Sequence, residues 1–288
     1  MTDVMPEFTG YAIEQEDRQS LAAGSTACKT LPLGDLPERV DPRRHEKFAD
    51  GWMRVENQGS IGSCQGASLT ECAEYSWVVS GGDVVQLSKM FAYLVSQEFD
   101  GISSDRGSTL SGGTKCLNQV GICPDSVAPY PSRYPGHRWL TSSMRQAAAK
   151  YKMETHTVLR SAIECKQFIG SGLGIVQIGI PWGRAMTPDR SGCIRSFAPG
   201  GGGHAVVFCG YLPDAEVGQQ STSGYWLLLK NSWSTRWGIK GFAYVDPAAV
   251  TQMISHRWSV FVGRSDMATP TPRPLPVDFT KPGQSRYQ

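Results

Sequence analysis

The spacing of apolar residues predicts helices in the first half of the chain. Residues 64–79 form a run without proline that ends before a pair of glycines, which is a typical helix stop. Residues 90–95 place apolar side chains at helical spacing after Ser88, a residue type that caps helix starts. Further helices are predicted at 109–120, which a glycine follows, and at the Ala-rich stretch 144–151.

The second half changes to patterns that are typical of strands. Ser161 and Glu164 first form a capping-box pattern, which predicts one more helix start. Alternation of apolar residues at 176–180 then has the period of a half-buried strand. Apolar runs rich in strand-forming residues follow at 204–211, 225–230, 242–245 and 259–262. Helices followed by strands are the signature of an α+β protein, and we expect two lobes with a cleft where they meet.

The two ends of the chain depart from these patterns. Residues 1–36 lack strong periodicity, and we interpret them as an N-terminal arm or a poorly ordered lead. Residues 264–288 are rich in proline, which favours an extended, polyproline-like tail. We expect a plain flexible end, and the alternative is a tail that docks onto a protein partner. We therefore place one domain at 37–263, with a helical lobe at about 64–150 and a β-rich lobe at about 160–263.

Composition and charge narrow the class of protein. A chain of 288 residues with 40% apolar residues fits a soluble globular protein with a sizeable core. The net charge of +2, without a dense Lys/Arg stripe, argues against a nucleic-acid partner. The polar, acidic start lacks a secretory-signal pattern, and no apolar run approaches the roughly 18 residues of a membrane span. We therefore expect a cytoplasmic protein without a membrane partner, unless export by a non-standard route or packaging in a particle intervenes.

The cysteines are expected to be packing residues for the most part. Their even number permits a disulfide framework, but a chain of this length does not need one. No CxxC pair is present, which argues against a structural zinc site. Most lie in apolar stretches, as small buried side chains do. They are Cys28, Cys64, Cys72, Cys116, Cys123, Cys165, Cys193 and Cys209.

Cys64 is the exception, because a glycine-punctuated loop ends at this residue where a helix is predicted to begin. A helix N-terminus carries partial positive charge and free N–H groups, which stabilise an anion. A thiolate there has a lowered pKa and becomes a useful nucleophile. The alternative is a buried cysteine that happens to follow a surface loop.

His204 and Asn231 are the candidate partners of this thiol. His204 follows four glycines and opens an apolar run, which makes it a better base candidate than an ordinary core histidine. Asn231 ends another apolar run and precedes Trp233 and Trp237. An asparagine can accept an imidazole N–H without adding charge, and Trp233 could shield that bond from water. The alternative for this segment is a strand end with aromatic packing.

These segments together resemble the active site of papain-like cysteine peptidases. Cys64, His204 and Asn231 follow the family's order. Gln58 lies six residues before Cys64, where the family has its oxyanion-hole glutamine. The resemblance extends over residues 36–263.

The resemblance implies a papain-like fold with a helical lobe, an antiparallel β-barrel-like lobe and the active-site cleft between them. It also implies hydrolysis of peptide bonds in a polypeptide substrate, with Cys64 attacking the carbonyl and His204 protonating the leaving amine. No metal and no organic cofactor are implied. The substrate-binding residues that it implies are Gly112, Gly113, Gly203 and Trp233.

The chain also departs from the family's pattern near the nucleophile. Ile61 stands where secreted members have a disulfide-bonded cysteine, which fits a reducing compartment. Gln65 replaces an aromatic residue, and a polar insertion at about 213–224 separates two predicted paired strands. The lead before Leu36 is expected to be too short for the family's long inhibitory propeptide, so either the form is processed or its activity is controlled in another way. Two alternatives stay open: a catalytically silent binding module, and an acyl transferase or deamidase with the same triad.

Overall fold

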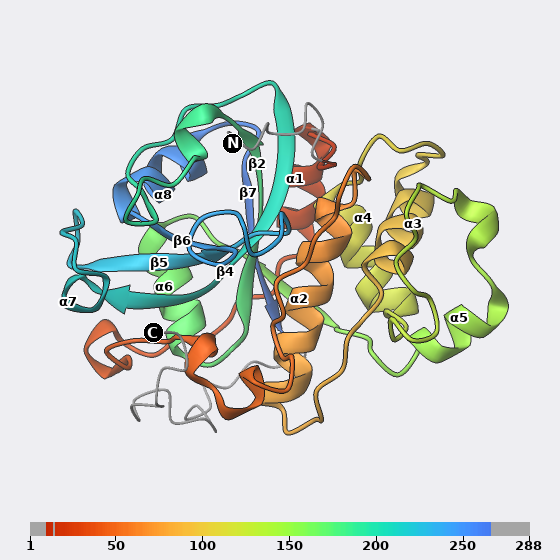
Figure 1. Cartoon of the computed structure of the whole chain (residues 1–288), viewed down its shortest axis with the longest axis horizontal. Coiled ribbons are helices and arrows are strands. Elements are labelled where there is room, and N and C mark those ends of the chain that lie inside the picture. Colours follow the sequence, from red (N-terminus) through yellow and green to blue (C-terminus); the bar gives the residue numbers. More distant parts are fainter. Residues whose placement is uncertain (1–9, 14, 266–288) are drawn as a thin grey trace.

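The computed structural model describes residues 10–13 and 15–265. Figure 1 shows a helical half beside a half built on a twisted sheet, and the long helix α2 (Cys64–Val79) lies at their junction. This is the α+β arrangement that the order of the predicted elements indicated. Among the described residues, no helix combines the length and the apolar character that a membrane crossing requires.

The helices of the first half begin at side-chain caps, except for α2, whose N-cap Ser63 makes no side-chain cap bond. They are α2, α3 (Lys89–Asp100), α4 (Leu110–Lys115) with the π-helical turn η4 (Cys116–Val120), and α5 (Ser142–Ala148). The Ser88 hydroxyl accepts the Phe91 N–H at 3.1 Å at the start of α3. The Thr109 hydroxyl accepts the Gly112 N–H at 2.9 Å at the start of α4. Gly101 ends α3 with a left-handed φ of 70°. The four helices predicted for this half are therefore confirmed.

The other half contains a seven-stranded sheet with the order β1-β7-β2-β4-β5-β6-β3. The strands are β1 (Thr155–Val158), β2 (Ile175–Trp182), β3 (Cys193–Ile194), β4 (Gly202–Pro213), β5 (Tyr225–Lys230), β6 (Phe242–Val245) and β7 (Val260–Ser265). Neighbouring strands are antiparallel except for the parallel pair β3 and β6. We expected an antiparallel, barrel-like lobe. The described sheet is open instead, because the short strand β3 joins β6 and does not close against β1.

Helices cover both faces of the central strands. α2 packs on β2 and β4 from one side, whereas α6 (Ala162–Gly170) packs on them from the other side and contacts α8 (Pro247–Ser255). Alternate residues of β2 enter different buried clusters, so that Ile178 lies with residues of α6 and Ile175 with residues of α2. Every residue of β2 is therefore buried, although its alternation predicted a half-buried strand.

The N-terminal lead contains a helix that the apolar pattern did not predict. In α1 (Gln15–Ala23), Leu21 is buried while Ala22 and Ala23 are exposed, so the helix carries little periodic signal. The chain after α1 is bonded to the sheet half: the Thr26 N–H donates to the carbonyl of His156 at 2.8 Å. The described part of the lead is therefore an arm that is hydrogen-bonded to the sheet half.

Both chain ends extend beyond the described residues, which exclude 1–9 and 266–288. β7 continues to Ser265, two residues into the predicted tail, and the rest of that tail lies outside the described residues. The short elements are α7 (Asp214–Val217), which lies in the predicted insertion, η1 (Leu33–Asp35), η2 (Pro42–Arg44), η3 (Glu46–Phe48), η5 (His137–Trp139) and η6 (Arg184–Met186).

A buried ion pair joins α2 to the sheet half. The Lys230 ammonium at the end of β5 bonds to the Glu71 carboxylate on α2, and both side chains are buried. Burial raises the pKa of Glu71, and the charge of Lys230 opposes this rise. Because Lys230 directly precedes Asn231, the pair also anchors the strand end that carries a candidate site residue.

All eight cysteines are free thiols, as expected, and all but the half-buried Cys28 are buried.

Candidate active site

Cys64 is the first residue of α2. The loop that precedes it is fixed by hydrogen bonds to Asp105 and Tyr130. The Gly62 N–H donates to Asp105 Oδ1 at 2.9 Å, and the Ser63 hydroxyl lies 2.6 Å from the Tyr130 hydroxyl. Cys64 itself is 0% exposed. The predicted position of the thiol at a helix N-terminus is therefore present, but water does not reach it in this state.

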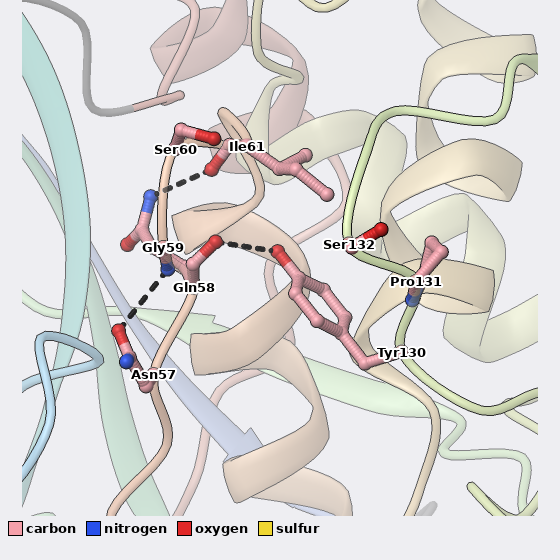
Figure 2. A pocket seen from close by; sticks show the side chains of 8 residues that line it. All are labelled: Asn57, Gln58, Gly59, Ser60, Ile61, Tyr130, Pro131 and Ser132. Carbon is pink, nitrogen blue, oxygen red and sulfur yellow. Dashed lines mark hydrogen bonds between the residues drawn. The ribbon is translucent and has the colours of Figure 1, made fainter.

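Gln58 is fixed in the same loop by bonds on both ends of its side chain. Its Nε2 donates to the Ile61 carbonyl at 3.1 Å, and its Oε1 accepts the Ser232 hydroxyl at 2.7 Å. Figure 2 shows this loop framing a hollow with the Tyr130 ring, whose hydroxyl donates to the Gln58 carbonyl at 2.9 Å. The bond to Ser232 ties Gln58 to the segment that follows Asn231.

His204 and Asn231 form a hydrogen bond whose direction can be assigned. His204 Nε2 lies 2.8 Å from Asn231 Oδ1, and the same Oδ1 accepts the Ser232 N–H at 2.8 Å. The backbone donor identifies that atom as the oxygen, so Nε2 must carry the proton. Nδ1 then holds a lone pair, and it is buried without a hydrogen-bond partner among the described residues. This is the arrangement of a base that is ready to accept a proton at Nδ1.

Two tryptophans enclose the imidazole of His204. The Trp233 ring stacks on it with the centroids 4.5 Å apart, and the Trp182 ring meets it edge-on at 4.8 Å. Trp233 therefore lies where the sequence predicted a shield for the bond between His204 and Asn231. Both rings exclude water from that bond, which strengthens it.

The strand β4 brings His204 next to the thiol. Ala205, the residue after His204, donates its N–H to Cys64 Sγ at 3.3 Å. Burial raises the pKa of the Cys64 thiol to about 12, although the N–H groups of Ala205 and Gln65 oppose the rise. Burial also lowers the pKa of His204 to about 4. The described state therefore favours a neutral thiol and a neutral imidazole, whereas the position at a helix start predicted a thiol with a lowered pKa.

The N-terminal segment contributes to this burial, because it lies across the site as an extended chain. The Tyr11 N–H donates to the Gly203 carbonyl at 3.2 Å, and the Ala12 N–H donates to the Ser108 carbonyl at 3.0 Å. The Ser108 N–H in turn donates to the Gly10 carbonyl at 3.2 Å. Tyr11 is 2% exposed and lies in one buried cluster with Cys64. Residues 10–13, the covering segment, thus connect the two halves over the nucleophile.

Residues 36–259 match the model of the papain family of cysteine proteases. The chain belongs to this family. It is 26% identical to cathepsin F of Drosophila melanogaster over 88% of this chain and 39% of that protein. It is 25% identical to the viral cathepsin of Choristoneura fumiferana defective polyhedrosis virus, over 85% of this chain and 69% of that protein. The chain thus spans well under half of the cathepsin F that it matches.

Solved structures of cysteine proteases share the fold of this papain-family chain. Xylellain from Xylella fastidiosa superposes with a TM-score of 0.68 at 19% identity, over 93% of this chain and all of that one. The ragweed pollen protease Amb a 11, solved in its proform, superposes with a TM-score of 0.65 at 16% identity, over 90% of this chain and 75% of that one.

The predicted substrate-binding glycines of this papain-family chain lie in different places. Gly203 contacts the covering segment, because a Cβ on it would come within 2.1 Å of the Tyr11 carbonyl oxygen. Gly112 and Gly113 lie inside α4 instead. A Cβ on Gly112 would meet Asp100 at 2.3 Å, and one on Gly113 would meet Gln65 at 2.1 Å. The structure therefore packs this glycine pair against α3 and α2.

Gly107 and Ser108 are the residues that hold the covering segment on the helical half, and sequence reasoning missed them. A Cβ on Gly107 would lie 2.7 Å from the Gly10 carbonyl oxygen, and its φ of +85° favours glycine in any case. The available signal was a glycine two residues before the helix cap Thr109, which marks a turn at the start of a helix.

Proposed function

We propose that this papain-family chain hydrolyses peptide bonds, with Cys64 as the nucleophile, His204 as the base and Asn231 as the group that orients His204. The proposal is carried by one observation. Asn231 holds the Nε2 proton of His204, which leaves the Nδ1 lone pair for a thiol at the adjacent start of α2. The substrate is a polypeptide, which enters when the covering segment leaves.

In the proposed reaction, Cys64 Sγ transfers its proton to His204 Nδ1 and attacks the scissile carbonyl carbon. The oxyanion accepts hydrogen bonds from the Cys64 N–H and the Gln58 side-chain amide, and one such donor is typically worth ~3 kcal/mol in the transition state. The intermediate collapses to a thioester as His204 Nδ1 protonates the leaving amine. Water, deprotonated by His204, then attacks the thioester and releases the acid and the free thiol.

The test is cleavage of a peptide library by the full-length chain and by Cys64→Ala, read by mass spectrometry. We expect Cys64→Ala to abolish both cleavage and labelling by a thiol-directed epoxide. Cys28→Ala is the matched control, because Cys28 is a half-buried thiol distant in sequence from the triad, and it should change neither result. Full activity of Cys64→Ala would refute the assignment of the nucleophile.

A catalytically silent papain-fold module is the second candidate, and one observation favours it. Cys64 and His204 are both 0% exposed, which also fits a site that no substrate enters. The two candidates differ in the uncovered state. A silent module would show no Cys64-dependent cleavage even when a substitution in the covering segment lets small thiol reagents reach Cys64.

A further inference from the structure

Gln65 departs from the family's pattern, and the proposed peptidase chemistry gives it no role. We propose that Gln65 is a positioning residue. Its bond to Ser108 fixes the distance between the Cys64 thiol and the backbone of Ser108, which hydrogen-bonds to the main chain of the substrate. This inference rests on the proposed function of the same site, and it gives a role to a residue that departs from the family's pattern.

Gln65 is placed to transmit position because it is adjacent to Cys64 on α2. Its side chain is 0% exposed, and its Oε1 accepts the hydroxyl of Ser108 at 2.7 Å. On the other side of Cys64, the Gly62 N–H donates to Asp105 at 2.9 Å. The loop 105–108 is therefore bonded to the chain two residues before the nucleophile and one residue after it.

Ser108 is the part of this loop that binds extended peptide. Its N–H donates to the Gly10 carbonyl at 3.2 Å, and its carbonyl accepts the Ala12 N–H at 3.0 Å. A substrate that replaces the covering segment meets the same donor and acceptor, as in other recognition by an added strand. The distance from Ser108 to Cys64 then decides where the scissile carbonyl lies relative to the thiol.

The side-chain amide of Gln65 leaves a buried N–H donor unpaired within the described part of the chain, which costs free energy. This cost indicates that the bond accepted by its Oε1 has a function. Gln65 Nε2 is buried without a hydrogen-bond partner among the described residues. Gly113 leaves room for this group, since a Cβ there would come within 2.1 Å of Nε2. An apolar side chain would fill the same space without an unsatisfied donor. The bond from Ser108 to Oε1 is the contact that an apolar residue would lose.

The test uses the full-length chain with Gln65→Leu, with Ser108→Ala and with both substitutions. Ser68→Ala is the matched control, because it removes a buried hydroxyl one turn along α2 that donates to the Gln65 carbonyl and accepts from Gln177 Nε2, but does not bond to Ser108. Each variant is also made with Tyr11→Ala, which removes the buried ring of the covering segment. Two readouts are measured: cleavage of peptides and hydrolysis of p-nitrophenyl acetate, an ester too small to reach Ser108.

We expect Gln65→Leu to lower kcat for peptides by about tenfold or more, since a misplacement of about 1 Å can cost about a hundredfold. Hydrolysis of the ester should stay within about twofold. Ser108→Ala should give the same loss, and the double variant no further loss, because both substitutions break one bond. Equal loss for peptide and ester would overturn positioning and leave Gln65 a packing residue. Cleavage that is unchanged by Gln65→Leu would overturn it as well.

A second measurement does not depend on catalytic activity, because the covering segment is hydrogen-bonded to the same backbone of Ser108. Hydrogen exchange of the Ala12 N–H, which donates to Ser108, should be about fivefold faster in Gln65→Leu and Ser108→Ala, as expected for loss of one supporting bond. Ser68→Ala should not change it. Unchanged exchange in Gln65→Leu would overturn the proposal. Absence of Cys64-dependent cleavage in every variant would count against the proposed function alone, and the exchange result would still decide the role of Gln65.

Discussion

Tyr11→Ala should uncover Cys64 without unfolding the protein. The ring of Tyr11 lies against the α-carbon of Gly179, where a Cβ would come within 2.6 Å of the ring, and it belongs to the buried cluster that contains Cys64. Truncating a buried aromatic side chain to alanine typically costs about 3–5 kcal/mol. The main-chain bonds of residues 10–12 remain, so the loss falls on the attachment of the covering segment.

The expected magnitude follows from the open population. If about 3 kcal/mol is lost from the attachment, the uncovered fraction rises by about a hundredfold, since each 1.4 kcal/mol is a factor of ten. Alkylation of a buried thiol follows the open population when opening is fast. We therefore expect iodoacetamide to modify Cys64 about a hundred times faster in Tyr11→Ala. The measurement is the rate of mass increase of the peptide that contains Cys64, under native conditions.

Cys72 is the internal control for this experiment. It lies two turns further along α2, is 0% exposed, and belongs to a different buried cluster. Local opening of the covering segment should accelerate the alkylation of Cys64 and leave Cys72 unmodified. If Cys64 is not accelerated, or if both thiols accelerate in step, the covering segment is not an independent cover and the reasoning fails.

Two further predictions concern the buried charges of α2. Lys230→Met should destabilise the fold by about 3–5 kcal/mol in urea denaturation, because it leaves the carboxylate of Glu71 buried without its ion pair. Adding Glu71→Gln should recover part of that loss; no recovery would contradict the role of the pair. Burial raises the pKa of Glu74 from 4.5 to about 8. Between these pH values the folded state keeps a proton that the unfolded state releases. The contribution of Glu74 to the free energy of unfolding therefore falls as pH rises from about 4.5 to about 8. Glu74→Gln should therefore raise the Tm more at the upper end of that range than at the lower end, and an equal shift at both ends would refute the assignment.

The elements that the sequence predicted best are those with the clearest local signals. The bounds predicted for α2 and β5 are those observed, because α2 has a clear glycine stop and β5 is a short apolar run between polar segments. The capping residues Ser88 and Ser161 also have the predicted role, each accepting an N–H from three residues later. Such signals depend on few residues that are close in sequence.

What the sequence did not predict depends on contacts between distant residues. Nothing in the spacing of Gly112 and Gly113 shows that Asp100 and Gln65 occupy the space beside them. The covering segment is also invisible to periodicity, since four residues form its described part and Tyr11 is its one large aromatic side chain. His204 and Asn231 could be singled out in advance because each ends or begins an apolar run, but the assignment of the proton to Nε2 needed the bond from the Ser232 N–H.

Tyr11 belongs to the covering segment and to the hydrophobic core at once, which constrains how this chain can evolve. A substitution of Tyr11 that releases the segment also removes a buried ring, so access to Cys64 and loss of stability would arise from one mutation. Lineages that drift toward a permanently open site must first accumulate stabilising changes elsewhere. Coupling of this kind makes the covered form the easier one for natural selection to keep.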